Sequence, residues 1–317
     1  MEKQYVIGID IGGTNTKFGL VDRNGNIVEQ GRMRTDAHEN AEDFIEELYA
    51  DLSLLIAKHG GTKNIKGIGV GAPNGNYYSG TIEYAPNLKW KGIIPIADLI
   101  EKKFNLPTKL TNDANAAAVG EMMYGAAKGM KHFITITLGT GVGSGIVIDG
   151  KIVLGHDGFA GELGHTIIRP GGRMHKGTGI RGSLESYASA TGVRETAIEM
   201  LTEDSTTASL LRNYSIDDLT SETVFKCAEQ GDAIANQIFE FTGQILGEAL
   251  ENFVMFSSPE AIVLFGGLTK AGDLILKPTI QAMEANLIQI FKNKVKIIYS
   301  ELKEADAAIL GASALVW

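Results

Sequence analysis

Two segments of the chain resemble each other, and this repeat constrains the fold more than any other feature of the sequence. Residues 6–28 read VIGIDIGGTNTKFGLVDRNGNIV, and residues 133–153 read FITITLGTGVGSGIVIDGKIV. Each segment begins with alternating apolar residues, makes a glycine-rich turn, continues as an apolar strand and reaches an Asn-Gly or Asp-Gly pair, which favours a tight hairpin. A strand–turn–strand–hairpin–strand unit that occurs twice predicts a duplicated domain.

Helical and extended patterns alternate along the rest of the chain. Apolar residues recur at helical spacing around residues 40–59. Further helices are expected near 94–104, 115–128, from 184, at 232–256 and from 306, and strands at 67–73, 108–113, 261–267 and 295–300, with an irregular stretch up to Trp90. Strands that alternate with helices predict mixed α/β layers. A chain of 317 residues also exceeds what one core usually serves, which favours two domains.

Composition excludes several classes of function. A formal net charge of −9 argues against a general nucleic-acid binder and against an anionic-membrane binder. No apolar run approaches the roughly 18 to 20 residues that span a bilayer, and the start of the sequence lacks the pattern of a signal peptide. The single cysteine, Cys227, excludes an intrachain disulfide and a multi-cysteine metal cage. We therefore expect a cytoplasmic protein.

The first glycine-rich turn places an acid, Asp10, at a strand end beside Gly12, Gly13 and Thr14. Glycines let backbone N–H groups approach phosphate oxygens, and a carboxylate holds magnesium or its water, so this combination suits a nucleotide. The second turn, which contains Gly139, Thr140 and Gly141, repeats the glycines without the acid. The alternative is a pair of tight turns without a ligand. The pair Gly266 and Gly267 follows another strand and is assigned to the adenosine half, although a plain strand-to-helix turn explains it equally well.

Three polar residues, Asn112, Asp113 and Asn115, crowd the point where a strand ends and an alanine-rich helix begins. Helix capping explains one Asp or Asn at such a place. An aspartate held there is also suited to accept the proton of an attacking hydroxyl. Both interpretations stay open on the residues alone.

A second polar cluster reads GELGH and places Glu162 three residues before His165, with Glu185 and Tyr187 following a glycine-rich loop. Carboxylates with an imidazole suit the vicinal hydroxyls of a sugar, which both donate and accept hydrogen bonds. A metal site is the rival interpretation, but the neighbouring glycines disfavour the helix that it would need. His175 is a candidate for a second imidazole in this cluster, but the sequence favours a solvated loop histidine.

The combination of DIGGTNTK, GAPNG, NDANAAA, LGTGVGSG, GELGH and GSLESYAS resembles the ROK family of sugar kinases within the actin-like ATPase superfamily, from about residue 5 to 316. The resemblance implies an α/β fold of duplicated actin-like (ribonuclease H-like) ATPase domains with a cleft between them. We expect one domain at residues 1–115, with the helix at 306–317 packing back onto it, and a larger one at 116–305.

The resemblance also implies roles for individual residues. Asp113 would be the catalytic base, and Asn112 would hold the sugar beside it. Further sugar contacts would come from Gly75, Asn87, Glu162, His165 and Glu185. The phosphates of ATP and the Mg²⁺ bound to them would face Asp10, Gly12, Gly13, Thr14, Gly139, Thr140 and Gly141. Asp10 is the expected magnesium contact.

Two departures from the family pattern change what we expect. Many members bind a structural zinc ion through a histidine and three cysteines, but the cysteine positions here hold Lys176, Thr178 and Ser183. None of these replaces a thiolate ligand, so we expect no structural zinc. Repressors of the family carry a DNA-binding module before the first strand, and only about four residues precede it here. We therefore expect no direct binding to DNA.

The sequence thus predicts an ATP:sugar phosphotransferase of the glucokinase type that converts glucose to glucose 6-phosphate. N-acetylglucosamine, N-acetylmannosamine and mannose remain alternative substrates. A non-catalytic sugar sensor and a different actin-like phosphotransferase, acting on a carboxylic acid or a polyol, are the competing functions. Family membership suggests a homodimer or homotetramer.

Overall fold

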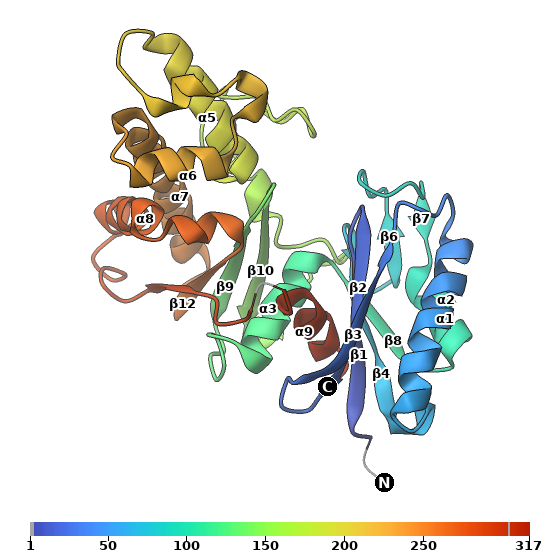
Figure 1. Ribbon diagram of the computed structural model, residues 1–317. Coiled ribbons are helices and arrows are strands. Elements are labelled where there is room, and N and C mark those ends of the chain that lie inside the picture. Colours follow the sequence, from blue (N-terminus) through green and yellow to red (C-terminus); the bar gives the residue numbers. More distant parts are fainter. Residues whose placement is uncertain (1–2, 304) are drawn as a thin grey trace. The chain divides into compact units, whose positions relative to one another are not determined.

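The computed structural model describes residues 3–303 and 305–317, which form two compact units (Figure 1). The first unit contains the chain up to residue 131, residues 145–161 and residues 300–317. The second contains residues 132–144 and 162–299. The boundary predicted at residue 115 falls inside the first unit, to which residues 306–317 also belong.

A five-stranded sheet forms the centre of the first unit. Its strands are β1 (Tyr5–Ile11), β2 (Asn15–Asp22), β3 (Ile27–Arg34), β4 (Ile65–Gly71) and β8 (Thr108–Thr111), in the order β3-β2-β1-β4-β8. The first three strands pair antiparallel, and β4 and β8 continue the sheet in parallel with β1. Helices α1 (Ala41–Lys58) and α2 (Ile96–Phe104) lie close to the positions that their periodicity predicts.

The alternation of residues in β1 decides what each face of this sheet contacts. Ile7, Ile9 and Ile11 are buried in one core with the apolar residues of α1 and α2. Val6 points to the opposite face and packs with apolar residues of α9 (Ala307–Ala314). Since side chains alternate between the faces of a strand, Gly8 and Asp10 share the face of Val6.

Helix α9 approaches this second face at glycine residues. A Cβ atom added to Gly8 or Gly69 would lie 2.1 or 1.9 Å from a carbonyl oxygen of α9. Where α9 meets α3 (Asp113–Tyr124), a Cβ at Gly120 would lie 2.8 Å from the Cα of Gly311. The backbone of α9 therefore contacts both the sheet and α3 with no side chain between them.

The second sheet repeats the strand order of the first. Its strands are β9 (Phe133–Leu138), β10 (Val142–Ile148), β11 (Lys151–Ile152), β12 (Ala261–Phe265) and β13 (Lys296–Tyr299), in the order β11-β10-β9-β12-β13. Again a hairpin joins the outer strands, here with positive φ angles at Asp149 and Gly150, and parallel strands complete the sheet. The predicted duplication is confirmed.

The helices of the second unit are α4 (Glu185–Ala188), α5 (Ala190–Glu203), α6 (Ser221–Glu229), α7 (Ala233–Ser257) and α8 (Asp273–Asn286). Helix α7 matches the helix predicted at 232–256, and α6 was not predicted. The helix expected from residue 184 is interrupted at Ser189, whose extended backbone lets its hydroxyl cap α5 by accepting the N–H of Gly192 at 2.9 Å. Among residues 3–303 and 305–317, no helix combines the length and apolar character that a membrane span requires.

The stretch expected to be irregular before Trp90 contains two strands, β5 (Gly75–Asn76) and β6 (Thr81–Glu83). They form a small antiparallel sheet with β7 (Ile93–Ile94), which follows Trp90, in the order β5-β6-β7. The prediction was wrong here because strands of two or three residues are too short to show an alternating pattern.

Candidate active site

The turn between β1 and β2 is tight because of its glycines. Gly12 donates its N–H to the carbonyl oxygen of Asn15 at 3.0 Å, and a Cβ on Gly12 would lie 2.9 Å from that oxygen. A Cβ on Gly13 would lie 2.7 Å from the carbonyl oxygen of Asn87. The structure therefore brings Asn87, predicted as a sugar contact, against the turn predicted to bind phosphate; Thr14 in the same turn is exposed.

Asp10 and Asp113 lie close enough for their charges to interact. Burial is the main cause that raises the pKa of Asp10 to about 6, the charge of Asp113 raises it further, and Lys17 opposes both. Lys17 pairs directly with Asp10 across the β1–β2 ladder. Sequence reasoning missed Lys17, although the turn fixes this register. Two neighbouring acids with a raised pKa fit a site that accepts a cation.

Asp113 is the first residue of α3, directly after the N-cap Asn112. Surrounding protein desolvates the carboxylate and raises its pKa, while the N–H of Ala114, which donates to Oδ1 at 2.8 Å, opposes that rise. The residue as a whole is exposed, so contact with solvent opposes this rise in pKa. Its own backbone N–H also donates to the carboxylate. A carboxylate at an exposed residue is available to accept a proton.

Capping, the alternative explanation for this segment, accounts for Asn112. Its Oδ1 accepts the N–H of Asn115 at 2.7 Å, which is the bond that an N-cap residue makes. Asn115 itself is buried, and neither polar atom of its side chain has a hydrogen-bond partner in the described protein. Capping therefore explains Asn112 without assigning any task to Asp113.

Gly75 lies in β5 beside the end of β8. A Cβ there would lie 2.5 Å from the carbonyl oxygen of Thr111, the residue before Asn112. The N–H of Gly75 donates to the carbonyl oxygen of Ala72 at 3.1 Å, so this N–H is not free for a ligand. The packing places β5 next to the strand end that leads into α3.

The second glycine turn joins β9 to β10 and meets the start of α5. The N–H of Gly139 donates to the carbonyl oxygen of Gly141 at 3.0 Å. The carbonyl oxygen of Gly139 accepts the N–H of Ala190 at 2.8 Å, and the Thr191 hydroxyl donates to the carbonyl of Thr140 at 2.9 Å. These bonds fix the turn from outside, as a rigid phosphate cradle requires.

The pair Gly266 and Gly267 lies beside this turn. Gly266 has a φ of 109°, and a Cβ there would lie 2.5 Å from the carbonyl oxygen of Leu138, the residue before Gly139. Around Gly267 there is open space. The structure thus brings both predicted nucleotide segments of the second unit to one edge of its sheet.

The GELGH segment packs onto β10. A Cβ on Gly164 would lie 2.1 Å from the carbonyl oxygen of Val142, and the N–H of Leu163 donates to the hydroxyl of Ser144 at 3.1 Å. Only a single turn of 3₁₀ helix forms, which leaves Glu162 Oε2 and His165 Nε2 3.8 Å apart. The expectation that the glycines prevent a longer helix is confirmed.

Glu185, predicted as a sugar contact, lies against the second glycine turn. Its Oε2 accepts the N–H of Val142 at 2.7 Å, and a Cβ on Gly141 would lie only 2.3 Å from that oxygen. Gly141 is therefore a glycine because the carboxylate occupies the space of a side chain. The other oxygen, Oε1, lies 3.1 Å from Nε2 of His175. The interpretation of His175 as a solvated histidine was wrong, since its side chain is only 22% exposed.

The positions where many family members carry zinc ligands do not fit a zinc ion here. Lys176 pairs with Glu195, Thr178 bonds to His175, and the Ser183 hydroxyl bonds to that of Ser186 at 2.8 Å. In the described part of the chain, no three His, Cys, Asp or Glu side chains gather as a metal-binding group. His165 Nδ1 is buried without a hydrogen-bond partner there, but one nitrogen is not a zinc site.

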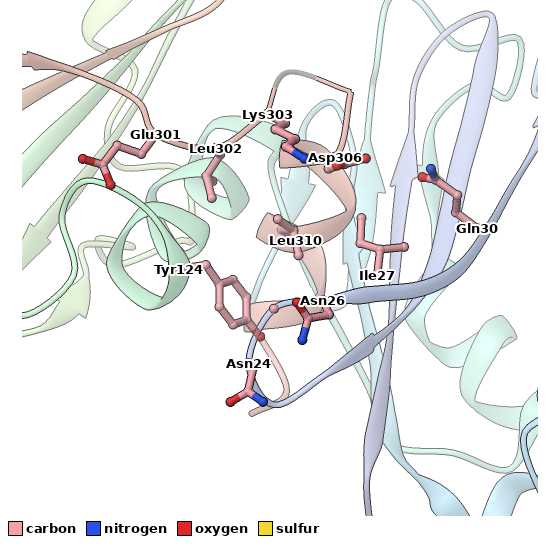
Figure 2. Close-up of a pocket in the computed structure, with 11 residues that line it drawn as sticks. Asn24, Asn26, Ile27, Gln30, Tyr124, Glu301, Leu302, Lys303, Asp306 and Leu310 are labelled. Atoms are coloured by element: carbon pink, nitrogen blue, oxygen red, sulfur yellow. The ribbon is translucent and has the colours of Figure 1, made fainter.

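A cavity of about 420 Å³ in the first unit lies apart from these residues (Figure 2). It opens between the β2–β3 hairpin, Tyr124 at the end of α3 and the segment that leads into α9. None of the residues predicted for the site lines it.

Comparison with known proteins shows which family this chain is similar to. The model of the ROK family matches residues 6–317. A glucokinase from Halalkalibacterium halodurans is 36% identical over 100% of this chain and 96% of its own length. A ROK family glucokinase from Streptomyces griseus, solved in complex with glucose and AMPPNP, has a TM-score of 0.78 at 31% identity and covers 98% of this chain and 99% of its own. A xylose repressor from Caldicellulosiruptor bescii is 30% identical over 98% of this chain and 77% of its own length. The chain therefore belongs to the ROK family.

Proposed function

We propose that this protein is an ATP-dependent glucokinase that converts glucose to glucose 6-phosphate, with Asp113 as the general base. The single observation that carries the proposal is the pair of acids in the first unit, one partly buried with a raised pKa and one exposed at the start of a helix. A kinase needs one carboxylate near the metal and one near the attacking hydroxyl. The similarity to proteins named glucokinase supports glucose as the substrate.

In the proposed reaction, each residue of the site has a separate role. Asp113 accepts the proton of the sugar hydroxyl as its oxygen attacks the γ-phosphorus in line. The N–H groups of Gly12 and Gly139 bond within their own turns, so Gly13 in the first turn and Thr140 and Gly141 in the second are the backbone donors proposed for phosphate oxygens. Glu185 and His165 orient the sugar. Asp10 would hold Mg²⁺ together with the phosphates, and when bound this ion neutralises charge on the transferring group.

Glucose is distinguished from the alternative sugars by a direct assay. ADP release is measured with glucose, mannose, N-acetylglucosamine and N-acetylmannosamine as the free sugar, in the presence of Mg-ATP. We expect the highest kcat/KM with glucose. A higher value with an N-acetylated sugar would reassign the substrate within the same mechanism, and ADP release with none of them would remove the kinase function.

A sugar-responsive protein without catalysis is the second candidate, because the xylose repressor matches nearly the whole chain. Such a protein would bind a free sugar in calorimetry without releasing ADP. The two acids argue for catalysis, since a sensor has no need of a carboxylate that is costly to keep ionised.

The pKa of Asp10 makes a prediction about stability. Its folded-state pKa of about 6 exceeds the ordinary value of 3.8, so ionisation destabilises the folded protein as pH rises through this interval. Asp10→Asn removes the buried charge. We expect this variant, without nucleotide, to be about 1 to 3 kcal/mol more stable than wild type at pH 8, with the difference lost near pH 4.

Denaturant unfolding at the two pH values measures this difference. Mg-ATP should stabilise the wild type at pH 8 and stabilise the variant much less, because Asp10 is the proposed magnesium contact. Equal stability of both proteins at pH 8 would contradict the burial of a charge at Asp10.

A further inference from the structure

Each carboxylate oxygen of Glu185 has a polar partner, and the side chain is only 12% exposed. The N–H of Val142 fixes Oε2 at 2.7 Å. Nε2 of His175 lies 3.1 Å from Oε1, within hydrogen-bonding distance. Two contacts on opposite oxygens restrict rotation of the carboxylate, and orientation of this kind is what a sugar contact needs.

The other nitrogen of the His175 ring determines where the proton lies. The backbone N–H of Thr178, which can only donate, points to Nδ1 at 3.3 Å, and the Thr178 hydroxyl lies 3.0 Å from the same atom. Nδ1 is therefore an acceptor, and the proton of the neutral ring is on Nε2, toward Glu185. A neutral histidine suffices for this arrangement.

His175 is itself held by a short loop. Its N–H donates to the carbonyl oxygen of Ile180, and its own carbonyl accepts the N–H of Gly179, both at 2.8 Å. An isolated bridge between Met174 and Arg181 closes the loop at its base. These bonds fix the backbone of His175, and the contacts of Thr178 with Nδ1 hold the ring toward Glu185.

Arg173 fastens the base of this loop to α4 and α5. Its guanidinium donates to the carbonyl oxygens of Ser186 and Gly192 at 2.8 and 3.0 Å, and it lies 4.6 Å from the centre of the Tyr187 ring. It also pairs with Glu199. Hydrogen bonds of this loop and of Arg173 thus hold the segment that contains Lys176 and Thr178, two of the positions where the family pattern has zinc ligands.

We propose that His175 is a positioning residue for sugar binding. Its Nε2 orients Glu185, so an ordered 173–181 loop keeps that carboxylate in place. The inference rests on the proposed function, because it takes Glu185 as a sugar contact. Loss of the contact should weaken sugar binding more than turnover, since Asp113 and the phosphate turns do not depend on it. The affinity for ATP should change little, because Val142 still holds Oε2.

Two substitutions of similar size separate positioning from packing. In His175→Gln the amide N–H takes the place of Nε2 and still reaches Glu185, whereas in His175→Asn the side chain is too short. We expect His175→Asn to raise the KM for glucose about tenfold with kcat and the KM for ATP changed less than about threefold. His175→Gln should stay within about threefold of wild type for all three constants.

The dissociation constant of glucose, measured by calorimetry without ATP, provides a readout that is independent of turnover and should follow the same pattern. In a Glu185→Gln background, His175→Asn should add less than about twofold, because the two residues act through one contact. Thermal unfolding of each variant shows whether the loop has lost its fold. Equal losses in His175→Gln and His175→Asn, or a full tenfold addition in the double variant, would overturn the proposal.

The outcomes also separate this inference from the proposed function. If Glu185→Gln weakens glucose binding and His175→Asn does not, the positioning role fails and the kinase assignment stands. If Glu185→Gln leaves glucose binding unchanged, the positioning role fails together with the sugar contact of Glu185, while the kinase function still stands on ADP release. If the wild type binds no sugar and releases no ADP, both fail. Stoichiometric zinc in the purified wild-type protein would show that a metal orders the loop, and would likewise overturn the role of His175.

Discussion

Replacing Asp113 by Asn is expected to lower kcat by roughly 10²- to 10⁴-fold, the range associated with general-base catalysis. The amide has the shape of the carboxylate but cannot accept a proton. It can still take the hydrogen bond that the N–H of Ala114 donates, so the start of α3 should be preserved. The dissociation constant of glucose should therefore change only a few-fold.

The matched control for this experiment is Asp98→Asn. Asp98 also lies in the first turn of a helix of the first unit, but it belongs to α2 and is not among the site residues. Turnover of this variant should equal that of the wild type. Calorimetry with glucose and steady-state ADP release measure the two quantities separately, and near-normal turnover in Asp113→Asn would take the role of base away from this residue.

The largest effect on stability is expected from Gly8→Ala. The new methyl group would lie 2.1 Å from the carbonyl oxygen of Ile309, a backbone atom that cannot move without displacing α9 from the sheet. Overpacking of a core usually costs about 1 to 3 kcal/mol, and a collision with backbone belongs at or above the upper end. We expect a loss of about 3 kcal/mol or more in the free energy of unfolding.

Gly19→Ala is the control, because Gly19 pairs with Gly8 across the same ladder. A methyl group there would meet the side chain of Ile309 at 3.0 Å, and the end of a side chain can shift. We expect this variant to lose less than half as much stability in denaturant unfolding. Equal losses would show that the cost comes from the strand glycines themselves and not from the approach of α9.

The sequence was most informative about features that depend on a local pattern of residues, such as hairpins and helix starts. The repeat predicted a duplicated domain, because an Asn-Gly or Asp-Gly hairpin and alternating apolar residues act over a few neighbouring positions. The structure shows the duplication as two sheets with the same strand order. The place of Asp113 at the start of a helix was also predictable, since a cap and an alanine-rich run mark that boundary.

Other features depend on residues far apart in the chain and left no local pattern. Gly141 was interpreted only as part of a phosphate turn, yet Glu185 fills the space beside it. His175 seemed a surface residue until the loop placed its ring against that carboxylate. Nothing near Gly8 shows that a carbonyl of α9 will lie on top of it. Such contacts are decided by tertiary packing and not by the period of a strand or a helix.

The position of α9 has a consequence for synthesis on the ribosome. The sheet of the first unit is complete in sequence by Thr111, but α9, which packs against Gly8 and Gly69 on one face of this sheet, lies at residues 307–314. Domains usually fold in the order in which they emerge, the N-terminal one first. Here the second unit, residues 132–144 and 162–299, emerges before α9, so the part of β1 and β4 that α9 contacts stays uncovered while that unit is translated. A chaperone that binds apolar surface would bind this part of the sheet during that interval, and docking of α9 would then bury its binding site.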